Sequence, residues 1–168
     1  MRLMTRSLTT AAALYGFTAP ALYAQAEVRP NFTGTWLFDA AKSQSSNTLP
    51  SAAQYTIVQH GDTVIVDRET TFEEIGVLKS RLVVGIDGKP WKNTAPQPGI
   101  GDVETSSVVS WDKAVLVIVS SGNIQGTDFV QTDHWTLGTD GKTLTSVRSV
   151  TVEGNEVQSA TFSFTKKS

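Results

Sequence analysis

Asp133 is the side chain in this sequence that is best suited to proton chemistry. It alternates with Gln131 and Trp135, and alternate residues of a β-strand point to the same side. If that side faces the interior, the carboxylate lies among aromatic rings, where a charge is costly unless it is paired or hydrogen-bonded. Asp133 is therefore a candidate general acid or base, or a candidate ligand contact. The alternative is a carboxylate that is paired, or lies near water, and has no such role.

Tyr55 and Arg68 form a second candidate pair. A two-residue turn at Gly61 and Asp62 sets Tyr55 opposite Arg68 in a hairpin. A phenol beside a guanidinium group can hold the acidic head group of a small molecule, although the same pair could be a solvated cross-strand contact. Tryptophans on inward faces could line a cavity or fill it. The candidate ligand contacts are Tyr55, Arg68, Trp91, Gln131, Asp133 and Trp135.

Patterns typical of metal and cofactor sites are missing from the sequence. His60 and His134 lie far apart, and neither is spaced from another His or a Cys as metal ligands are. The chain has no cysteine, which excludes disulfides and thiolate metal sites. It also lacks a nucleophile elbow, a phosphate-binding glycine loop and a dinucleotide fingerprint. We expect no metal and no cofactor, but a barrel enzyme could work with one or two inward polar groups.

Short strands must position these side chains, because no amphipathic helix longer than about two turns is visible after residue 30. Runs rich in Val, Ile, Thr, Phe and Trp alternate with Asp and Gly turns. We predict strands at 32–38, 53–60, 63–70, 77–86, 89–93, 103–111, 114–121, 124–137, 142–152 and 156–166. Consecutive hairpins form an antiparallel meander, which favours an all-β, single antiparallel up-and-down β-barrel of about 8–10 strands. Two longer loops are expected, at 40–50 with room for a short helical turn, and at 94–102, either a lid or an ordinary surface loop.

The turns also predict which residues face each other. A turn at Gly154 and Asn155 sets Thr145 opposite Phe164 and Val147 opposite Phe162. Similar turns pair Val84 with Trp91, Val109 with Leu116 and Trp111 with Ala114.

The turn at 139–141 allows two registers. A two-residue turn pairs Leu137 with Leu144 and Asp133 with Arg148, whereas a glycine bulge pairs Trp135 with Thr145 and Asp133 with Val147. We choose the bulge because it alone gathers on one face Phe129, Trp135, Leu137, Phe162 and Phe164.

Residues 1–26 are typical of a Sec-type bacterial signal peptide. Arg2 and Arg6 precede a short apolar stretch, and residues 24–26 (AQA) form a small-x-small cleavage site. The predicted domains are thus a signal peptide at 1–26 and one β-barrel domain at 27–168, in a periplasmic or secreted protein. Cleavage would change the formal charge from −2 to −4 by removing two basic residues. Mild acidity without a basic cluster argues against nucleic acid, and no later segment is apolar enough to be transmembrane.

The segments 32–36 (FTGTW) and 39–43 (DAAKS) resemble the opening of bacterial secreted lipocalin-like proteins, and 134–145 resembles their closing stretch. The Gly-x-Trp pattern is also similar to the first strand of the wider calycin group, which includes lipocalins, fatty-acid-binding proteins and avidins. The resemblance covers nearly the whole chain after residue 26 and implies a calycin-type β-barrel. It further implies that Trp36 packs under a basic residue of the last strand, here Lys166, as a structural barrel closure. Ten strands suit the fatty-acid-binding proteins better than eight-stranded lipocalins.

Three functions are compatible with these features. The first is an exported binding protein for a small apolar or amphipathic molecule held in the barrel. The second is a small enzyme of the isomerase, cyclase or hydratase kind that uses Asp133. The third is a filled barrel that acts as an envelope interaction module, suggested by the apolar run at 114–119. A non-catalytic binder is the leading hypothesis, and the ligand and the oligomeric state stay open.

Overall fold

Within residues 29–168, alternating runs of Val, Ile and Thr, separated by Gly and Asp turns, form eleven strands in one antiparallel sheet. The structure is a computed structural model that describes residues 29–168, so the predicted signal peptide lies outside the described residues. The elements are β1 (Gly34–Phe38), η1 (Ala40–Lys42), β2 (Gln44–Ser45), β3 (Ala52–His60), β4 (Thr63–Phe72), β5 (Gly76–Gly85), β6 (Trp91–Gln97), β7 (Gly101–Asp112), β8 (Val115–Ile124), β9 (Thr127–Leu137), β10 (Thr143–Val152) and β11 (Asn155–Lys166).

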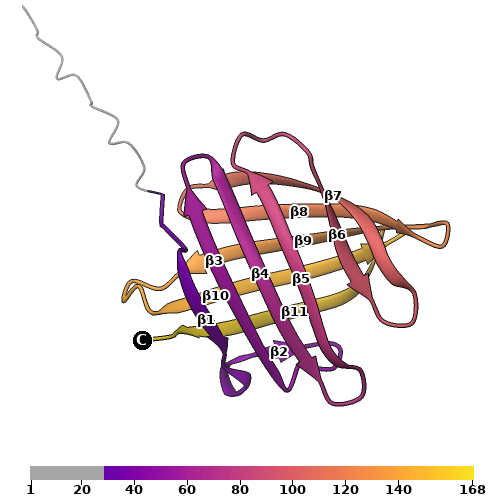
Figure 1. Cartoon of the computed structure of the whole chain (residues 1–168), viewed down its shortest axis with the longest axis horizontal. Helices are drawn as coiled ribbons and strands as arrows, with labels where there is room; N and C mark the ends of the chain where they lie inside the picture. Colours follow the sequence, from indigo (N-terminus) through magenta and orange to yellow (C-terminus); the bar gives the residue numbers. More distant parts are fainter. Residues whose placement is uncertain (1–28) are drawn as a thin grey trace, which may run out of the picture.

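The sheet curls into a nearly closed up-and-down barrel. Neighbouring strands follow the order β5-β4-β3-β1-β11-β10-β9-β8-β7-β6, and β2 adds to β11. The ladder between β1 and β11 therefore joins the first strand to the last. No ladder joins β5 to β6, although the two strands follow each other in the chain and are linked by one loop (Figure 1). We call this unladdered junction the β5–β6 gap. The predicted fold class is confirmed, with the additional short strand β2 in the loop at 40–50.

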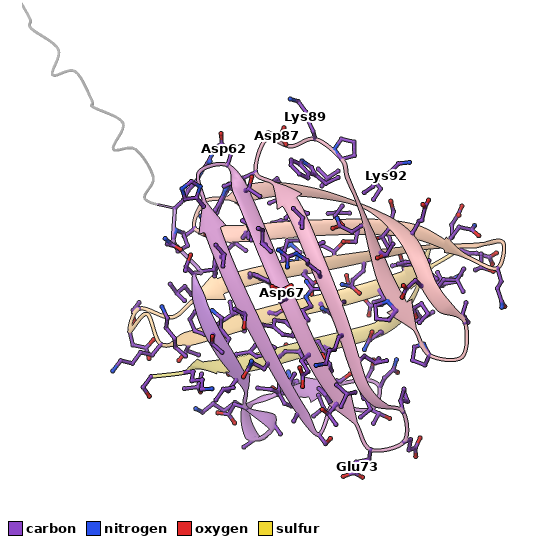
Figure 2. All side chains as sticks on the ribbon, viewed as in Figure 1. Asp62, Asp67, Glu73, Asp87, Lys89 and Lys92 are labelled. Atoms are coloured by element: carbon purple, nitrogen blue, oxygen red, sulfur yellow. The ribbon has the colours of Figure 1, made fainter. Side chains whose placement is uncertain are left out.

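The core lies inside the barrel because apolar side chains alternate along each strand. On β3, for example, Ala53, Tyr55 and Ile57 are buried, and on β4 Val64 and Val66 are fully buried. Intervening residues point outward, as does Asp67 midway along β4 (Figure 2). The same figure shows Asp62 and Asp87 in turns at one end of the barrel and Glu73 in a turn at the other. This period of two fixes which polar residues can enter the interior.

One end of the barrel is closed by aromatic rings. Trp36 is fully buried, and its Nε1 donates a hydrogen bond to the Phe32 carbonyl oxygen at 2.9 Å. The Phe32 ring packs against the rings of Trp111 and Trp135, whose centroids are 6.1 and 6.0 Å from its own. Lys166 is opposite Trp36 across the β1–β11 ladder, and its Nζ is 5.3 Å from the Trp36 ring centroid. Aromatic packing therefore closes this end of the barrel.

The register between β9 and β10 differs from the predicted bulged one. Asp133 faces Arg148 and Trp135 faces Ser146, so the prediction that Asp133 faces Val147 was wrong. The Asp140 carboxylate accepts hydrogen bonds from the backbone N–H groups of residues 142 and 143, and the Gly138 N–H donates to the residue 143 carbonyl at 2.7 Å. These bonds stabilise a longer loop that keeps Leu137 opposite Leu144.

The register between β10 and β11 is also shifted by one residue. Positive φ at Glu153 and Gly154 makes these two residues the centre of the turn, and a bulge follows at Val150 and Thr151. Leu144 and Ser146 therefore face Phe164 and Phe162, in place of the predicted Thr145 and Val147. Val147 points outward and is 47% exposed. The rings of Phe162, Phe164 and Trp135 still share the inner face, because the predicted parity was wrong only for β10.

Three further predictions need correction, and one is confirmed. The turn after β7 centres on Lys113 and the following residue, so Trp111 faces Leu116 and Val109 faces Ile118. Val84 and Trp91 do not pair, because they lie on either side of the β5–β6 gap. The expected loop at 94–102 is mostly strand, since β6 continues to Gln97 and its Pro96 is tolerated on an edge strand. The predicted pairing of Tyr55 with Arg68 is confirmed.

Candidate functional site

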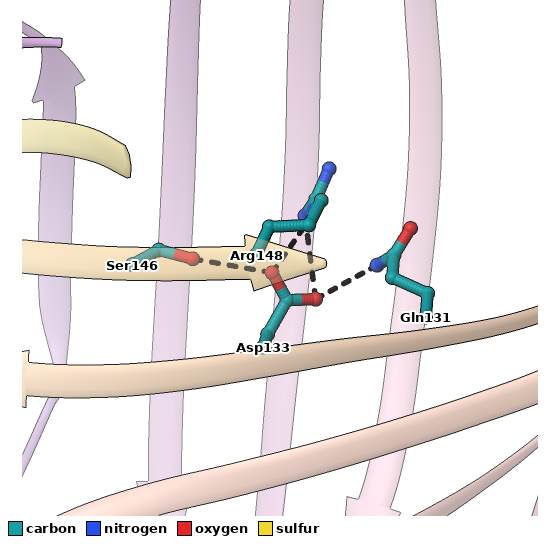
Figure 3. A network of polar contacts seen from close by, with 4 residues as sticks. All are labelled: Gln131, Asp133, Ser146 and Arg148. Carbon is teal, nitrogen blue, oxygen red and sulfur yellow. Dashed lines mark hydrogen bonds and ion pairs between the residues drawn. The ribbon is translucent and has the colours of Figure 1, made fainter. Parts of the chain in front are cut away.

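Asp133 lies at the centre of a polar network inside the barrel (Figure 3). Arg148 on β10 donates to it through Nε to Oδ1 at 2.8 Å and through Nη2 to Oδ2 at 3.4 Å. Gln131 on β9 donates through Nε2 to Oδ2 at 2.7 Å, and the Ser146 hydroxyl donates to Oδ1 at 3.2 Å. The β9–β10 register brings these residues together, because Asp133 faces Arg148 across the ladder and the others lie two residues away. The carboxylate is thus fully hydrogen-bonded.

Burial and charge act in opposite directions on the two ends of this ion pair. Burial alone raises the pKa of Asp133, whose exposed fraction is 1%. The charges of Arg148 and Arg68, with the hydrogen bonds from Arg148 and Gln131, outweigh burial and hold the pKa of Asp133 below its ordinary value. Burial lowers the pKa of Arg148, but the Asp133 carboxylate and the Tyr55 phenol raise it by a larger amount, so the pKa lies above its ordinary value. Both groups are therefore charged at neutral pH.

Arg68 is a second cation in the same interior. Its guanidinium carbon lies 5.4 Å from the Tyr55 ring centroid and 6.0 Å from the Trp135 ring centroid, so the side chain rests on two aromatic rings. The Nε of Arg68 is buried and has no hydrogen-bond partner within residues 29–168. Two arginines and one carboxylate leave this polar cluster with a net positive charge. A buried donor without a partner, beside an excess positive charge, is suited to an anionic acceptor.

A cavity of about 250 Å³, which we call the lumen cavity, lies next to this cluster inside the barrel. Tyr55, Arg68, Gln131 and Arg148 line its inner end. Its walls include Phe162 and Phe164, and further lining residues come from the ends of strands and the loop before β3: Thr48, Pro50, Phe72 and Gln97. The lumen cavity therefore reaches the end of the barrel that the aromatic closure leaves free. It combines apolar walls with a cationic floor.

The structure places the predicted ligand contacts in three groups. Tyr55, Arg68 and Gln131 line the lumen cavity. Asp133 and Trp135 lie beneath its floor, with exposed fractions of 1% and 0%. Trp91 lines no part of the lumen cavity and packs against Gly85, the last residue of β5, where a Cβ on residue 85 would lie 2.7 Å from the indole nitrogen of Trp91.

Arg148 and Ser146 were missed by the reasoning from sequence. The rejected two-residue register at 139–141 did pair Arg148 with Asp133, and it would have provided the inward cation that a buried carboxylate requires. Charge pairing would thus have been a better criterion for the register than the gathering of aromatic residues.

Other parts of the described chain offer weaker sites. Within residues 29–168, no group of three or more His, Asp or Glu side chains is placed to hold a metal ion. Depressions of about 370 and 510 Å³ lie on outer faces of the sheet between exposed polar side chains such as Glu69, Lys79 and Lys92. Another, of about 440 Å³, lies between the loop before β3 and the turn after β4. None of the helices in this part of the chain has the length and apolar character needed to cross a membrane.

Comparisons with known proteins place the fold but not the ligand. No protein-family model matches the sequence, and the comparison with curated proteins gives no match. Among solved structures, the chain is similar to a fatty acid binding protein from Schistosoma mansoni in complex with arachidonic acid. The TM-score is 0.50 and the identity 15%, over 82% of this chain and 96% of that chain. The fold resembles that of a fatty acid binding protein. This agrees with the calycin-type barrel that the Gly-x-Trp pattern implied.

Proposed function

We propose that this protein is an exported binding protein that holds a small amphipathic molecule, with its acidic head group on Arg68 and its apolar part in the lumen cavity. The observation that carries the proposal is the excess positive charge of the floor, where Arg68 has a buried donor without a partner. The structurally similar fatty acid binding protein was solved with arachidonic acid, an amphipathic carboxylate. Tyr55 and Gln131 line the same floor and can position the head group.

The size of the lumen cavity favours a compact ligand. Pockets for drug-sized molecules range from about 300 to 1,000 Å³, and this one measures about 250 Å³. A short or medium-length carboxylate therefore fits better than a long unsaturated chain, part of which would extend into solvent. The cavity also disfavours a filled barrel that acts only through its outer surface.

The alternative of a barrel enzyme is less well supported. Asp133 was the candidate acid or base, but its carboxylate is paired with Arg148 and accepts two further hydrogen bonds. Its lowered pKa keeps it ionised at neutral pH, so it cannot donate a proton there, and its oxygens are occupied. We therefore assign Asp133 a structural role, as the anion that holds Arg148 in place.

Calorimetric titration of the purified protein with decanoate and with neutral decanol tests the proposal. We expect decanoate to bind at least tenfold more tightly, because a charge-assisted hydrogen bond contributes about 1.5–3 kcal/mol. Arg68→Met should remove this preference, and Arg68→Lys should keep part of it. Lys79→Met, on the outer face of β5, is the control and should behave as the wild type. Equal affinity for the two ligands, or binding of neither, would overturn the proposal.

Export rests on residues 1–26 alone and has its own test. The charged start, the apolar stretch and the AQA site together motivate it. Expression in a bacterium, followed by fractionation and mass spectrometry, should give a periplasmic or extracellular protein that begins at Glu27. An intact chain in the cytoplasm would contradict this part of the proposal and leave ligand binding untouched.

A further inference from the structure

The lumen cavity has a polar extension toward the β5–β6 gap. A second cavity of about 80 Å³, which we call the side pocket, shares with the lumen cavity the residues Arg68, Ser80, Ala95, Gln97 and Gln131. The two spaces therefore share part of their lining, and Arg68 belongs to both. A molecule whose head group rests on Arg68 can reach into both of them.

The lining of the side pocket differs in character from the walls of the lumen cavity. Its apolar lining residues are Leu82, Ala95 and Phe129, and the other nine of its twelve residues carry polar groups. Among them, the Thr105 and Ser120 hydroxyls come from neighbouring strands, and Thr105 is 8% exposed. A hydrocarbon placed here offers no acceptor or donor to these hydroxyls, and a buried hydroxyl left without a partner, as Thr105 would be, costs about 1–3 kcal/mol. The side pocket therefore disfavours an apolar tail.

Hydrogen bonds hold two of these polar side chains in fixed positions. The Ser120 hydroxyl lies 2.8 Å from that of Ser107, which is fully buried. One hydroxyl proton is used within this pair, so a second remains available to an acceptor. The Asn93 amide accepts from the Val83 N–H at 2.8 Å and donates to the Val83 carbonyl at 3.1 Å, which fixes its orientation. The polar groups are thus preorganised, and a ligand does not need to order them.

We propose that the ligand of this protein is a hydroxylated carboxylic acid, whose carboxylate rests on Arg68 and whose hydroxyl group enters the side pocket. This inference deepens the proposed function and rests on it. Because Arg68 lines both cavities, the hydroxyl group lies on the α or β carbon, close to the carboxylate. A volume of about 80 Å³ suits one small polar group with a few waters, at about 10–15 Å³ for each water centre.

Competitive calorimetry with four acids of equal chain length tests this assignment. The probes are decanoate, α-hydroxydecanoate, β-hydroxydecanoate and ω-hydroxydecanoate, each titrated into the purified protein. We expect at least one of the α- and β-hydroxy acids to bind about tenfold more tightly than decanoate, since one buried hydrogen bond has about this effect. The ω-hydroxy acid has the same composition, but its hydroxyl group lies at the apolar end, so it should bind no better than decanoate.

Variants of the side pocket connect the preference to its residues. Thr105→Val keeps the shape of the side chain and removes its hydroxyl group, and it should reduce the tenfold preference to twofold or less. Ser120→Ala is a second, independent variant with the same expected direction. Thr136→Val, at an exposed position on β9, is the matched control and should keep the full preference. A hydroxy-acid preference that survives in both pocket variants would overturn the assignment.

The outcomes separate this inference from the proposed function. If none of the four acids binds, the proposed function itself fails. If all four bind with equal affinity, the carboxylate site stands and the side pocket has no role in recognition. If only the ω-hydroxy acid gains affinity, the polar group of the ligand lies at the open end of the lumen cavity, and the assignment to the side pocket is wrong.

Discussion

Asp133 and Arg148 face each other across the β9–β10 ladder, and their side chains form an ion pair inside the barrel with Nε 2.8 Å from Oδ1. The exposed fractions of the two side chains are 1% and 17%. A buried pair of this kind sets the charge beside the neighbouring cavity, because it neutralises one cation and leaves Arg68 as the excess charge. Four predictions follow for the pair, for the closed end of the barrel and for the β5–β6 gap.

Removing one member of the ion pair should be far more destabilising than removing both. We expect Arg148→Met to lower the free energy of unfolding by about 3–5 kcal/mol, because it leaves the Asp133 charge without its main partner. The double variant Asp133→Leu with Arg148→Met should recover much of this loss, since no unpaired charge remains. Urea unfolding followed by tryptophan fluorescence measures both. Additive losses in the double variant would show that the pair is not coupled.

Stability should fall in acid with a contribution from Asp133. Its pKa is lowered in the folded protein, so the stabilisation is complete above the unfolded value of about 3.9 and is lost as the pH falls through the lower folded value. We therefore expect the unfolding free energy of the wild type to decline below about pH 4. The Asp133→Leu, Arg148→Met double variant should decline less steeply over the same range, because the titrating group is absent. Parallel pH profiles would contradict the assignment.

A larger residue at Gly34 should destabilise the barrel. Its φ of +149° is a conformation that L-residues rarely adopt, and a Cβ there would lie 2.6 Å from Cε of Lys166. We expect Gly34→Ala to cost about 1–3 kcal/mol of unfolding free energy, mainly through backbone strain. Combining it with Lys166→Ala separates the two causes, since shortening Lys166 relieves only the contact. Full rescue by Lys166→Ala would show that the contact, and not the backbone, is responsible.

The Asn93 side chain should link β5 and β6 across the β5–β6 gap. Its side-chain amide bonds to both the N–H and the carbonyl of Val83, as a neighbouring strand would. We expect Asn93→Ala to raise the exchange rate of the Val83 amide hydrogen about tenfold, measured by NMR, because the bond from that N–H is lost. Asn47→Ala, at an exposed position in the loop before β3, serves as the control. An unchanged Val83 exchange rate would mean that other contacts hold the two strands together.

Much of the barrel could be predicted from sequence because turn chemistry and residue alternation are local signals. The Gly61–Asp62 turn is two residues long and therefore fixes the pairing of Tyr55 with Arg68 without ambiguity. Alternation along each strand likewise identified the inward rings of Trp135, Phe162 and Phe164. These predictions need only the neighbours in the chain and the two-residue period of a strand.

The missed features depend on bonds that a residue pattern does not specify. The Asp140 side chain stabilises the loop before β10, and the bulge at Val150 shifts the pairing of β10 with β11 by one residue. For this reason the inward position of Arg148 was not predicted. β5 and β6 form no ladder, although the alternation of residues along these strands is also compatible with one. The side pocket arises from the β5–β6 gap together with residues of β7 to β9, which are distant in the sequence.

The β5–β6 gap also divides the chain into two meanders. Residues 34–85 and 91–166 each form a continuous set of hairpins, and β11 joins the two sets through its ladders with β1 and β2. The loop at 86–90 is the peptide link between the two sets. It connects β5 and β6, which are the two ends of the strand order, whereas the β1–β11 ladder lies within that order. A nick in this loop would leave every strand ladder intact. The two halves would then still be joined along β11 by its ladders and across the β5–β6 gap by the Asn93 side chain, so the barrel should survive the cut.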